Sequence, residues 1–369
     1  MIAAADRPSR RSAEARLLII DAYGRVRHAP RDAAIDLLRP GDLVIANDAA
    51  TLPASLQGDH LPSGKAIEVR LAGRRSLARD DVKEFTAVVF GEGDFHTRTE
   101  DRPLPPALTP GDRLALGPLS ATILNTLGHP RLVALGFDGT SDAIWAGLAR
   151  HGRPIQYAHI PEPLALWDVW TAIAGPPVAF EPPSAGFVLD WRMLAAMRAR
   201  GVEFASLTHA AGISSTGDDR LDARLPFDEP YNIPATTALA IGRARHKGQR
   251  IVAVGTTVVR ALEHAAGSNG RIHHGPGVAN QRIGPSTHLR IVDAILSGVH
   301  EPGTSHYDLL RAFADDAVLG RAQEEMSARG YRTHEFGDSV FIEASDSRAC
   351  GDARPKPRAT TILMSRDVA

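Results

Sequence analysis

One stretch of the chain, residues 250–263, has the pattern of a strand, a tight turn and a helix. Its first residues form an apolar run that stops at Gly255. Beyond the glycine, Val258, Val259 and Leu262 recur at the spacing of a helix face. We therefore expect the chain to be organised around a strand–turn–helix unit centred on Gly255.

This turn also has the features of a ligand site. Gly255 allows close approach to the backbone, and Thr256 or Thr257 can cap the following helix with a hydroxyl group. The amides at a helix N-terminus attract anions, and Arg260 and Glu263 fall on one face of the helix, one turn further on. The competing interpretation is that threonine only caps the helix and that Arg260 pairs with Glu263 at the surface.

Length and composition narrow the class of protein. A chain of 369 residues with 43% hydrophobic residues predicts about two domains with a sizeable core. The formal net charge of -1 gives no overall basic field for nucleic-acid binding, so a polynucleotide would need a local patch. One cysteine, Cys350, cannot form an internal disulfide, and we find neither a signal peptide nor a membrane span. These features predict a cytoplasmic protein.

Before this unit, the chain offers a second strand with polar residues at its end. Leu43 to Ala46 is an apolar run, and Asn47 and Asp48 follow it directly. Polar groups just beyond the carboxyl end of such a strand often face a ligand crevice. The alternative for Asn-Asp is an Asx turn.

The pattern of apolar runs changes along the chain and indicates the domain boundaries. Residues 66–137 hold short alternating apolar runs separated by Gly, Pro and Asp turns, which predicts an inserted antiparallel β-barrel domain. Residues 16–65 and 138–342 then form a main mixed α/β domain. Residues 1–15 and the polar stretch 343–369 are expected to be disordered.

The rest of the main domain gives further expected elements. Residues 188–200 predict an amphipathic helix with Trp191, Leu194 and Met197 on its apolar side. A strand over 202–207 precedes His209 and a polar loop, which is a candidate functional loop.

A group of histidines invites a metal interpretation. His273, His274 and His288 lie close in sequence, but no carboxylate or thiol spacing accompanies them. We therefore expect a solvated loop there and no metal cofactor.

Five stretches of the chain form a set of motifs in a fixed order across about residues 17–342. They are Pro40 to Asp48 with Pro53-Ala54, Pro110 to Leu114, Gly255 to Glu263, Ile291 to Leu296 leading to His300, and Gly330-Tyr331-Arg332 through Gly337-Asp338. Together they resemble the S-adenosylmethionine:tRNA ribosyltransferase-isomerase family of queuosine biosynthesis, in which the motifs have the same order.

The resemblance implies a main domain with a large mixed sheet and flanking helices, plus an inserted antiparallel β-barrel. It implies transfer of the ribosyl part of S-adenosylmethionine to the aminomethyl group of a deazaguanine in tRNA, with rearrangement to an epoxycyclopentane and release of adenine and methionine. S-adenosylmethionine is then a co-substrate and tRNA a partner of a protein that we expect to be monomeric.

The motif residues that this chain keeps are the candidate site residues. Asp48 and His209 are the candidates for proton transfer. The candidates for substrate binding are Asn47, Gly255, Thr256, Thr257, Arg260, Glu263, His300 and Asp338. The alternative is a structural role, with Asp338 as a cap and Arg260 paired with Glu263.

The chain also departs from the family pattern. Ala50 and Ser55 stand where the family usually has arginines, and its Ala-Pro-Thr-Ala-Gly-Leu-His-Phe appears as residues 181–189, Glu-Pro-Pro-Ser-Ala-Gly-Phe-Val-Leu, without the histidine. Ala or Ser cannot replace the charged fork of an arginine. Two alternatives to the family reaction therefore stay open: a divergent paralogue that uses a smaller acceptor, and a catalytically inactive binding protein.

Overall fold

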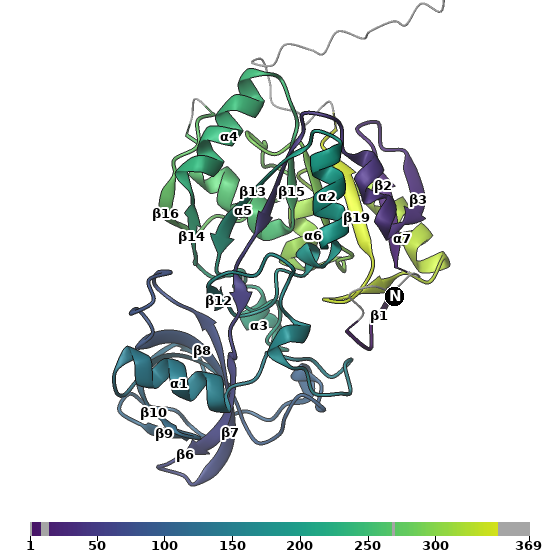
Figure 1. The fold of residues 1–369 in the computed structure, drawn as a ribbon. Helices are drawn as coiled ribbons and strands as arrows, with labels where there is room; N and C mark the ends of the chain where they lie inside the picture. The colour runs from purple at the N-terminus through teal and green to yellow at the C-terminus, as the bar shows by residue number, and fades with distance from the viewer. Residues whose placement is uncertain (1, 9–14, 268–269, 346–369) are drawn as a thin grey trace, which may run out of the picture.

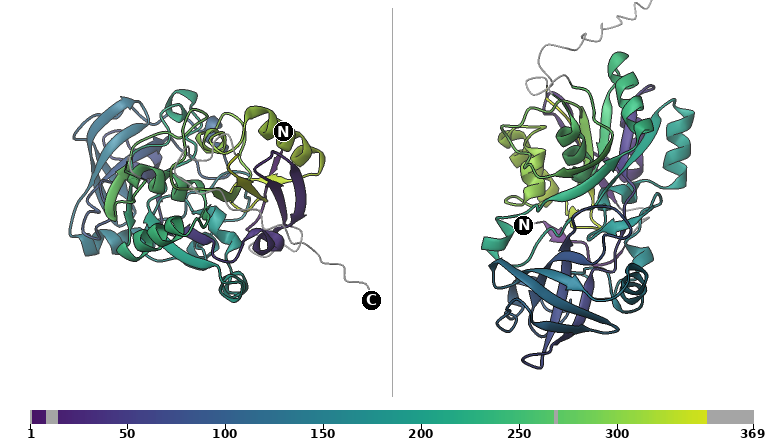
Figure 2. Two further views of the ribbon diagram at one scale, coloured as in Figure 1. Left: turned by 90° about the horizontal axis from the view of Figure 1, so that it is seen from above. Right: turned by 90° about the vertical axis from the view of Figure 1, so that its left-hand side faces the viewer.

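The computed structural model describes residues 2–8, 15–267 and 270–345, which form two domains (Figure 1). A large sheet with helices on both faces makes up the main domain, and a β-barrel lies at one end of it, as the right-hand view in Figure 2 shows. The predicted fold class, a mixed main domain with an inserted antiparallel barrel, is confirmed.

The main sheet has nine strands, with a parallel centre formed by β13, β4, β15 and β17. Antiparallel pairs extend it on the β13 side, and on the β17 side β19 and β2 are parallel to each other between two antiparallel pairs. The strands in order across the sheet are β16 (Gly275–Ala279), β14 (Glu229–Ile233), β13 (Glu203–His209), β4 (Leu43–Asn47), β15 (Ile251–Val254), β17 (Ala294–Gly298), β19 (Ser339–Glu343), β2 (Arg16–Ile20) and β3 (Val26–Pro30).

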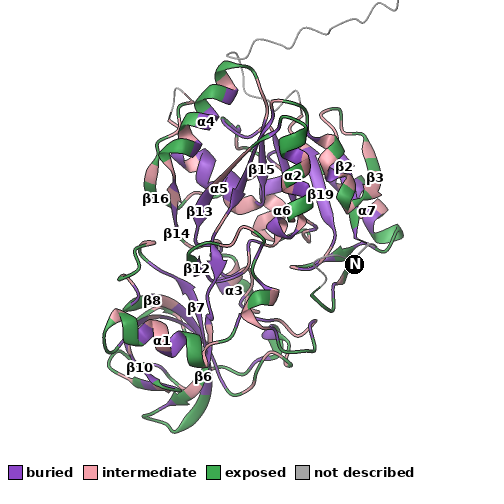
Figure 3. Ribbon diagram, in the orientation of Figure 1, coloured by how far each residue is buried: buried purple, intermediate pink, exposed green. Residues whose placement is uncertain are grey.

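The central strands are apolar on both faces because helices cover both sides of the sheet. In β4, Leu43 and Ile45 belong to one core and Val44 and Ala46 to the other. The first core includes residues of α4 (Ala235–His246), α5 (Thr256–Ala265), α6 (Ser305–Leu310) and α7 (Asp316–Ala328); the second includes residues of α2 (Trp191–Ala199). Figure 3 shows the resulting buried sheet between more exposed helices.

The barrel is closed and antiparallel. Its strands in order are β10 (Leu119–His129), β11 (Leu132–Phe137), β8 (Glu84–Phe90), β7 (Lys65–Gly73), β6 (Ser55–His60) and β9 (Arg113–Leu116). The expected boundaries of 66 and 137 are too narrow. Strand β6 precedes residue 66, and α1 (Ser141–His151) packs Ile144 and Leu148 into the barrel core.

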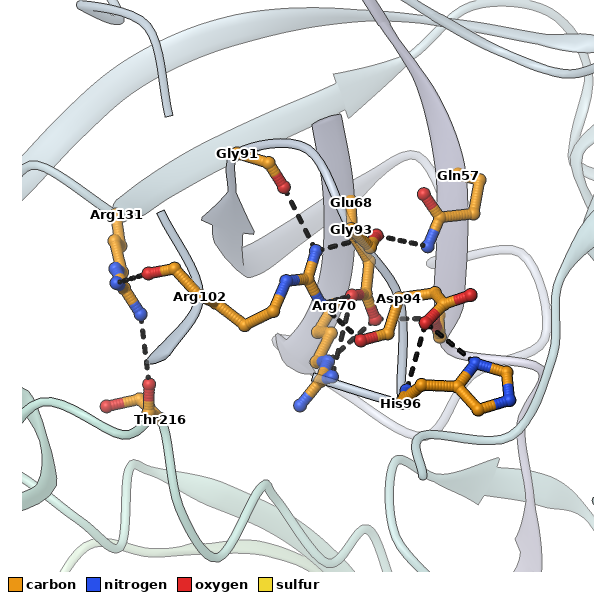
Figure 4. Close-up of polar contacts among 11 residues, drawn as sticks. Gln57, Glu68, Arg70, Gly91, Gly93, Asp94, His96, Arg102, Arg131 and Thr216 are labelled. Carbon is orange, nitrogen blue, oxygen red and sulfur yellow. Dashed lines mark hydrogen bonds and ion pairs between the residues drawn. The ribbon is translucent and has the colours of Figure 1, made fainter. Parts of the chain in front are cut away.

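Buried arginines hold loops of the barrel together, and one of them, Arg131, reaches the main domain (Figure 4). Glu68 accepts hydrogen bonds from Arg70 at 2.7 Å and from Arg102, and Arg102 also donates to the carbonyl groups of Gly91 and Gly93. Arg131 donates to the carbonyl of Thr216, 3.3 Å away. The buried charges are therefore paired or hydrogen-bonded, as burial of a charge requires.

Short elements complete the fold. Strand β1 (Ala3–Ala4) pairs with β18 (Arg332–Thr333). This pairing differs from the expectation that residues 1–15 are disordered. The remaining elements are β5 (Ala50–Thr51), β12 (Pro177–Ala179), α3 (Asp219–Asp222), and the 3-10 turns η1 (Arg31–Leu37), η2 (Thr99–Asp101), η3 (Leu166–Asp168) and η4 (Ser184–Val188). Of the expected disordered tail, residues 346–369 lie outside the described residues, whereas Glu343 ends β19.

The predicted helix over residues 188–200 is shorter, and its apolar side is assigned differently. Helix α2 starts at Trp191 behind the N-cap Asp190, whose side chain accepts a hydrogen bond from the Met193 amide at 2.7 Å. Trp191 is 73% exposed, whereas Met193 and Met197 are buried. Within the described ranges, every helix is too short or too polar to cross a lipid bilayer.

Candidate functional site

A cavity of about 920 Å³ opens at the carboxyl ends of β15 and β17, beside loops from the barrel domain. Gly255, which follows β15, and His300, which follows β17, line it, and Thr99 and Glu100 of η2 line it from the barrel. Its size lies within the range of about 300–1,000 Å³ that is usual for small-molecule sites.

The turn at Gly255 directs a helix N-terminus at this cavity. Gly255 has φ 95° and ψ 153°, a conformation essentially restricted to glycine, and its amide donates to the Leu296 carbonyl at 2.8 Å. Thr256 and Thr257 both line the cavity. The expected threonine cap is wrong, because Gly255 is the N-cap residue of α5 and no side chain caps the helix. The first amides of α5 thus keep their capacity to bind an anion.

Arg260 lines the cavity but is committed to protein partners. It is 4% exposed and forms an ion pair with Glu229 rather than with Glu263. The expected Arg260–Glu263 pair is therefore wrong, both as a surface pair and as an ion pair that holds the fold. Its guanidinium also donates to the carbonyl groups of Phe227, Ala279 and Gln281, at 2.9, 2.8 and 3.1 Å. Arg260 therefore fixes the wall of the cavity.

Glu229 joins Arg260 to His209. Its Oε2 lies 3.2 Å from His209 Nε2, and its Oε1 accepts from the Gly212 amide at 2.6 Å. Burial works to raise the pKa of Glu229, but His209, Arg260 and the Gly212 amide together lower it to about 2. Glu229 lines the cavity, whereas His209 is fully buried behind it. Direct proton transfer from His209 to a ligand has no support in this geometry.

Asn47 and Asp48 hold neighbouring strands together. The Asn47 side chain exchanges two 2.9 Å hydrogen bonds with the His209 backbone, and Asp48 accepts from the hydroxyls of Ser206 at 2.8 Å and Thr208 at 2.6 Å. Neither residue lines the cavity. Asn47 also donates to the hydroxyl of Thr257, 3.4 Å away, which does line the cavity, so the structure gives Asn47 an indirect contact with it and Asp48 none.

Glu263 and Asp338 have structural partners away from the cavity. The carboxylate of Glu263 accepts from the amides of Arg290, Ile291 and Val292 at 2.7–3.0 Å. Asp338 accepts from the amides of Arg16 and Arg332 at 2.6 and 2.8 Å, as a capping side chain does. Both were candidate binding residues, and both stabilise loops instead because their oxygens are used by backbone amides.

His300 is a binding candidate that the structure does place in the cavity. Its Nε2 lies 2.9 Å from the Ser297 hydroxyl, and its ring stacks on that of His306 with 5.0 Å between centroids. Burial, helped by His306 and His334, lowers the pKa of His300 well below its usual value. The ring is therefore neutral near pH 7 and can accept or donate a hydrogen bond.

The structure adds a carboxyl group that the sequence analysis did not select. Glu181 lines the cavity and accepts hydrogen bonds from the Tyr157 hydroxyl and, at 3.1 Å, from the Ser214 amide. Burial and the charge of Glu335 raise the pKa of Glu181 to about 7. A carboxyl group with this pKa can take up and return a proton near neutral pH.

Comparison with known proteins decides the relationship. A family described as queuosine biosynthesis protein matches residues 2–342. The chain belongs to the queuosine biosynthesis protein family. Curated relatives include the S-adenosylmethionine:tRNA ribosyltransferase-isomerases of Citrifermentans bemidjiense, 33% identical over 92% of this chain and 95% of that protein, and of Sorangium cellulosum, 32% identical over 93% and 96%.

A solved structure in the same comparison is the S-adenosylmethionine tRNA ribosyltransferase of Thermotoga maritima. It has a TM-score of 0.48 and 24% identity to this chain, and the match covers 92% of this chain and 96% of that one.

Within this member of the queuosine biosynthesis protein family, five of the ten sequence candidates line the cavity: Gly255, Thr256, Thr257, Arg260 and His300. The residues that were missed, Tyr157, Glu181 and Glu335, lie in loops without periodicity. The one signal in the sequence was that Glu181 begins a stretch that departs from the family pattern.

Proposed function

We propose that this chain transfers the ribosyl part of S-adenosylmethionine to the aminomethyl group of a 7-deazaguanine in tRNA and isomerises it to the epoxycyclopentane of epoxyqueuosine. Adenine and methionine are the other products. The observation that carries the proposal is the cavity at the α5 N-terminus, in a chain that matches the queuosine biosynthesis family over residues 2–342. We place this activity in the cytoplasm, on a monomer.

The amides and hydroxyls of Thr256 and Thr257 are proposed to hold an oxygen-rich part of S-adenosylmethionine, because the uncapped end of α5 favours negative charge. Gly255 keeps the backbone open to the ligand, and the neutral His300 supplies a further hydrogen bond. Arg260 and Glu229 form the wall that keeps this arrangement in place.

The reaction requires a base to remove a proton beside the sulfonium and a donor for the leaving adenine. Glu181 is the proposed base. It lines the cavity, its pKa is about 7, and Tyr157 and the Ser214 amide fix its carboxylate. His209 and Asp48 are proposed to act only through the residues that they position.

Binding of tRNA needs a local positive surface, since the chain has a formal net charge of -1. Arg98 and Arg282 are exposed residues on the lining of the cavity. We propose that they meet phosphates beside the modified base. Their Arg→Ala variants should weaken binding of tRNA more than binding of S-adenosylmethionine.

A second candidate is transfer to a smaller acceptor. This alternative starts from the two lost arginines of the family pattern. Ala50 is buried in β5 and Ser55 donates to Glu68 at 2.8 Å, so neither position offers a cation.

The test is release of adenine and methionine from S-adenosylmethionine, with and without tRNA that carries the aminomethyl base. Release that requires the tRNA supports the family reaction. Binding of S-adenosylmethionine without any release in the presence of this tRNA contradicts it. A smaller acceptor is then tested by adding candidate amines to the same assay, and an inactive binding protein releases no adenine with any of them.

A further inference from the structure

Three potential metal ligands meet on one wall of the cavity, although they come from two distant parts of the chain. His159 lies in the loop after α1, and His334 and Glu335 lie in the turn between β18 and β19. All three line the cavity. We propose that His159, His334 and Glu335 bind a divalent transition metal ion of the zinc type.

The distances suit a shared ion after small side-chain rotations. One ligand atom from each residue lies within 4.8 Å of the other two, and His159 Nε2 is 3.2 Å from Glu335 Oε2. Tetrahedral zinc, with bonds of about 2.0–2.1 Å, separates its ligand atoms by roughly 3.4 Å. The centroids of the stacked His159 and His334 rings are 4.4 Å apart, so both rings must rotate about their side-chain bonds to point a nitrogen atom at one ion.

The backbone holds His334 in place at an energetic cost. Among the described residues, His334 is the one non-glycine residue with a positive φ, 68°. Its carbonyl accepts from the Gly337 amide at 3.0 Å, and Asp338 caps the Arg332 amide at the start of the same turn. A conformation of this kind persists only where the surroundings enforce it. The pairing of β1 with β18 adds a further constraint on the turn.

The ligand set indicates the class of metal. Two imidazoles and one carboxylate favour zinc and its first-row neighbours over magnesium or calcium, which prefer oxygen ligands only. Three protein ligands leave a coordination position that faces the cavity, as in catalytic rather than structural zinc sites. An oxygen of a bound ligand or a water molecule would occupy it.

The competing explanation is that His159 only donates a hydrogen bond to Glu335. Calorimetric titration of the full-length, EDTA-treated protein with Zn²⁺ alone distinguishes the two, because it needs neither S-adenosylmethionine nor tRNA. We expect one equivalent to bind, and we expect Co²⁺ to give the visible spectrum of a four- or five-coordinate N/O site.

Three variants make the test specific. His334→Asn keeps a residue that tolerates the positive φ, and Glu335→Gln and His159→Gln keep size and polarity. Each should weaken Zn²⁺ binding at least tenfold and abolish the Co²⁺ spectrum, at an unchanged folded fraction by circular dichroism. His96→Ala is the control, because His96 also contacts a carboxylate, that of Asp94 at 2.9 Å, but lies outside this group.

Absence of one-equivalent Zn²⁺ binding, or binding that all three variants retain, would overturn the metal site. Either result leaves the proposed tRNA reaction untouched, because that reaction is measured separately by adenine release.

Discussion

The Tyr157 hydroxyl donates its hydrogen bond to Glu181, so the carboxyl group with the most strongly raised pKa among the described carboxyls is also held in one orientation in the cavity. The carbonyl oxygen of Ser215, 3.2 Å from the same hydroxyl, is a second acceptor within reach of its one hydrogen. A positioned carboxyl group with a pKa of about 7 is the arrangement that general base catalysis requires.

Glu181→Gln tests this assignment. The amide cannot accept the proton, so turnover should fall by about 100- to 10,000-fold, whereas the affinity for S-adenosylmethionine should change little. Single-turnover kinetics and calorimetry give the two quantities. Glu301→Gln, a change of another carboxylate on the cavity lining, is the matched control and should retain turnover. Equal turnover in the Glu181→Gln variant and the native protein would remove Glu181 from the mechanism.

The same carboxyl group makes stability depend on pH. The pKa of Glu181 rises from 4.5 to about 7 on folding, so the folded state favours the protonated form. The contribution of Glu181 to the free energy of unfolding is fully present below pH 4.5 and is lost as pH rises to about 7. The loss amounts to about 3 kcal/mol. In EDTA, Glu181→Gln should therefore be more stable than the native protein at pH 8 and similar at pH 4.5. Urea unfolding at both pH values measures this difference, and a constant difference would contradict the raised pKa.

Glu229 gives the opposite pH dependence. Its pKa falls from 4.5 to about 2 on folding, so the stability that it contributes is present above pH 4.5 and is lost as pH falls towards 2. Arg260→Ala, which leaves the buried Glu229 carboxylate without its ion-pair partner, should cost about 3–5 kcal/mol at pH 7. Chemical denaturation provides the value. Arg243→Ala, which removes an exposed pair with Glu203, should cost no more than about 1 kcal/mol, and a similar cost for both variants would refute the buried pair.

Sequence patterns predicted the scaffold better than the site. The apolar runs at β4 and β15 gave buried strands because both faces of the sheet are covered, and the alternating runs gave the barrel. Domain limits were less accurate, since β6 and α1 join the barrel core through contacts that no local pattern encodes.

Local sequence patterns also did not predict which partners the charged residues contact. Arg260 and Glu263 share a helix at favourable spacing, but Arg260 meets Glu229 and Glu263 meets the amides of residues 290–292. Tertiary contacts override the weak pairing of helix neighbours. Glu181 was missed for the same reason, because its raised pKa depends on burial and on Glu335, 154 positions along the chain.

Gly255→Ala tests the turn at the head of α5. At φ 95° and ψ 153° an alanine costs about 1–3 kcal/mol, and the shifted amides should weaken S-adenosylmethionine binding about tenfold. Thermal unfolding and calorimetry report the two effects. Gly248→Ala is the control, with a positive φ of 66° and open space around its added carbon. It should lower stability without changing ligand affinity, and an equal loss of affinity in both variants would argue against ligand binding at Gly255.

The central claim is that the cavity supports ribosyl transfer to tRNA. Mass spectrometry of nucleosides from tRNA that carries the aminomethyl deazaguanine, after incubation with this protein and S-adenosylmethionine, measures the product itself. The account predicts epoxyqueuosine in place of the starting base, and much less of it with Glu181→Gln. The account would be contradicted if the tRNA kept its starting base although the protein bound S-adenosylmethionine under the same conditions.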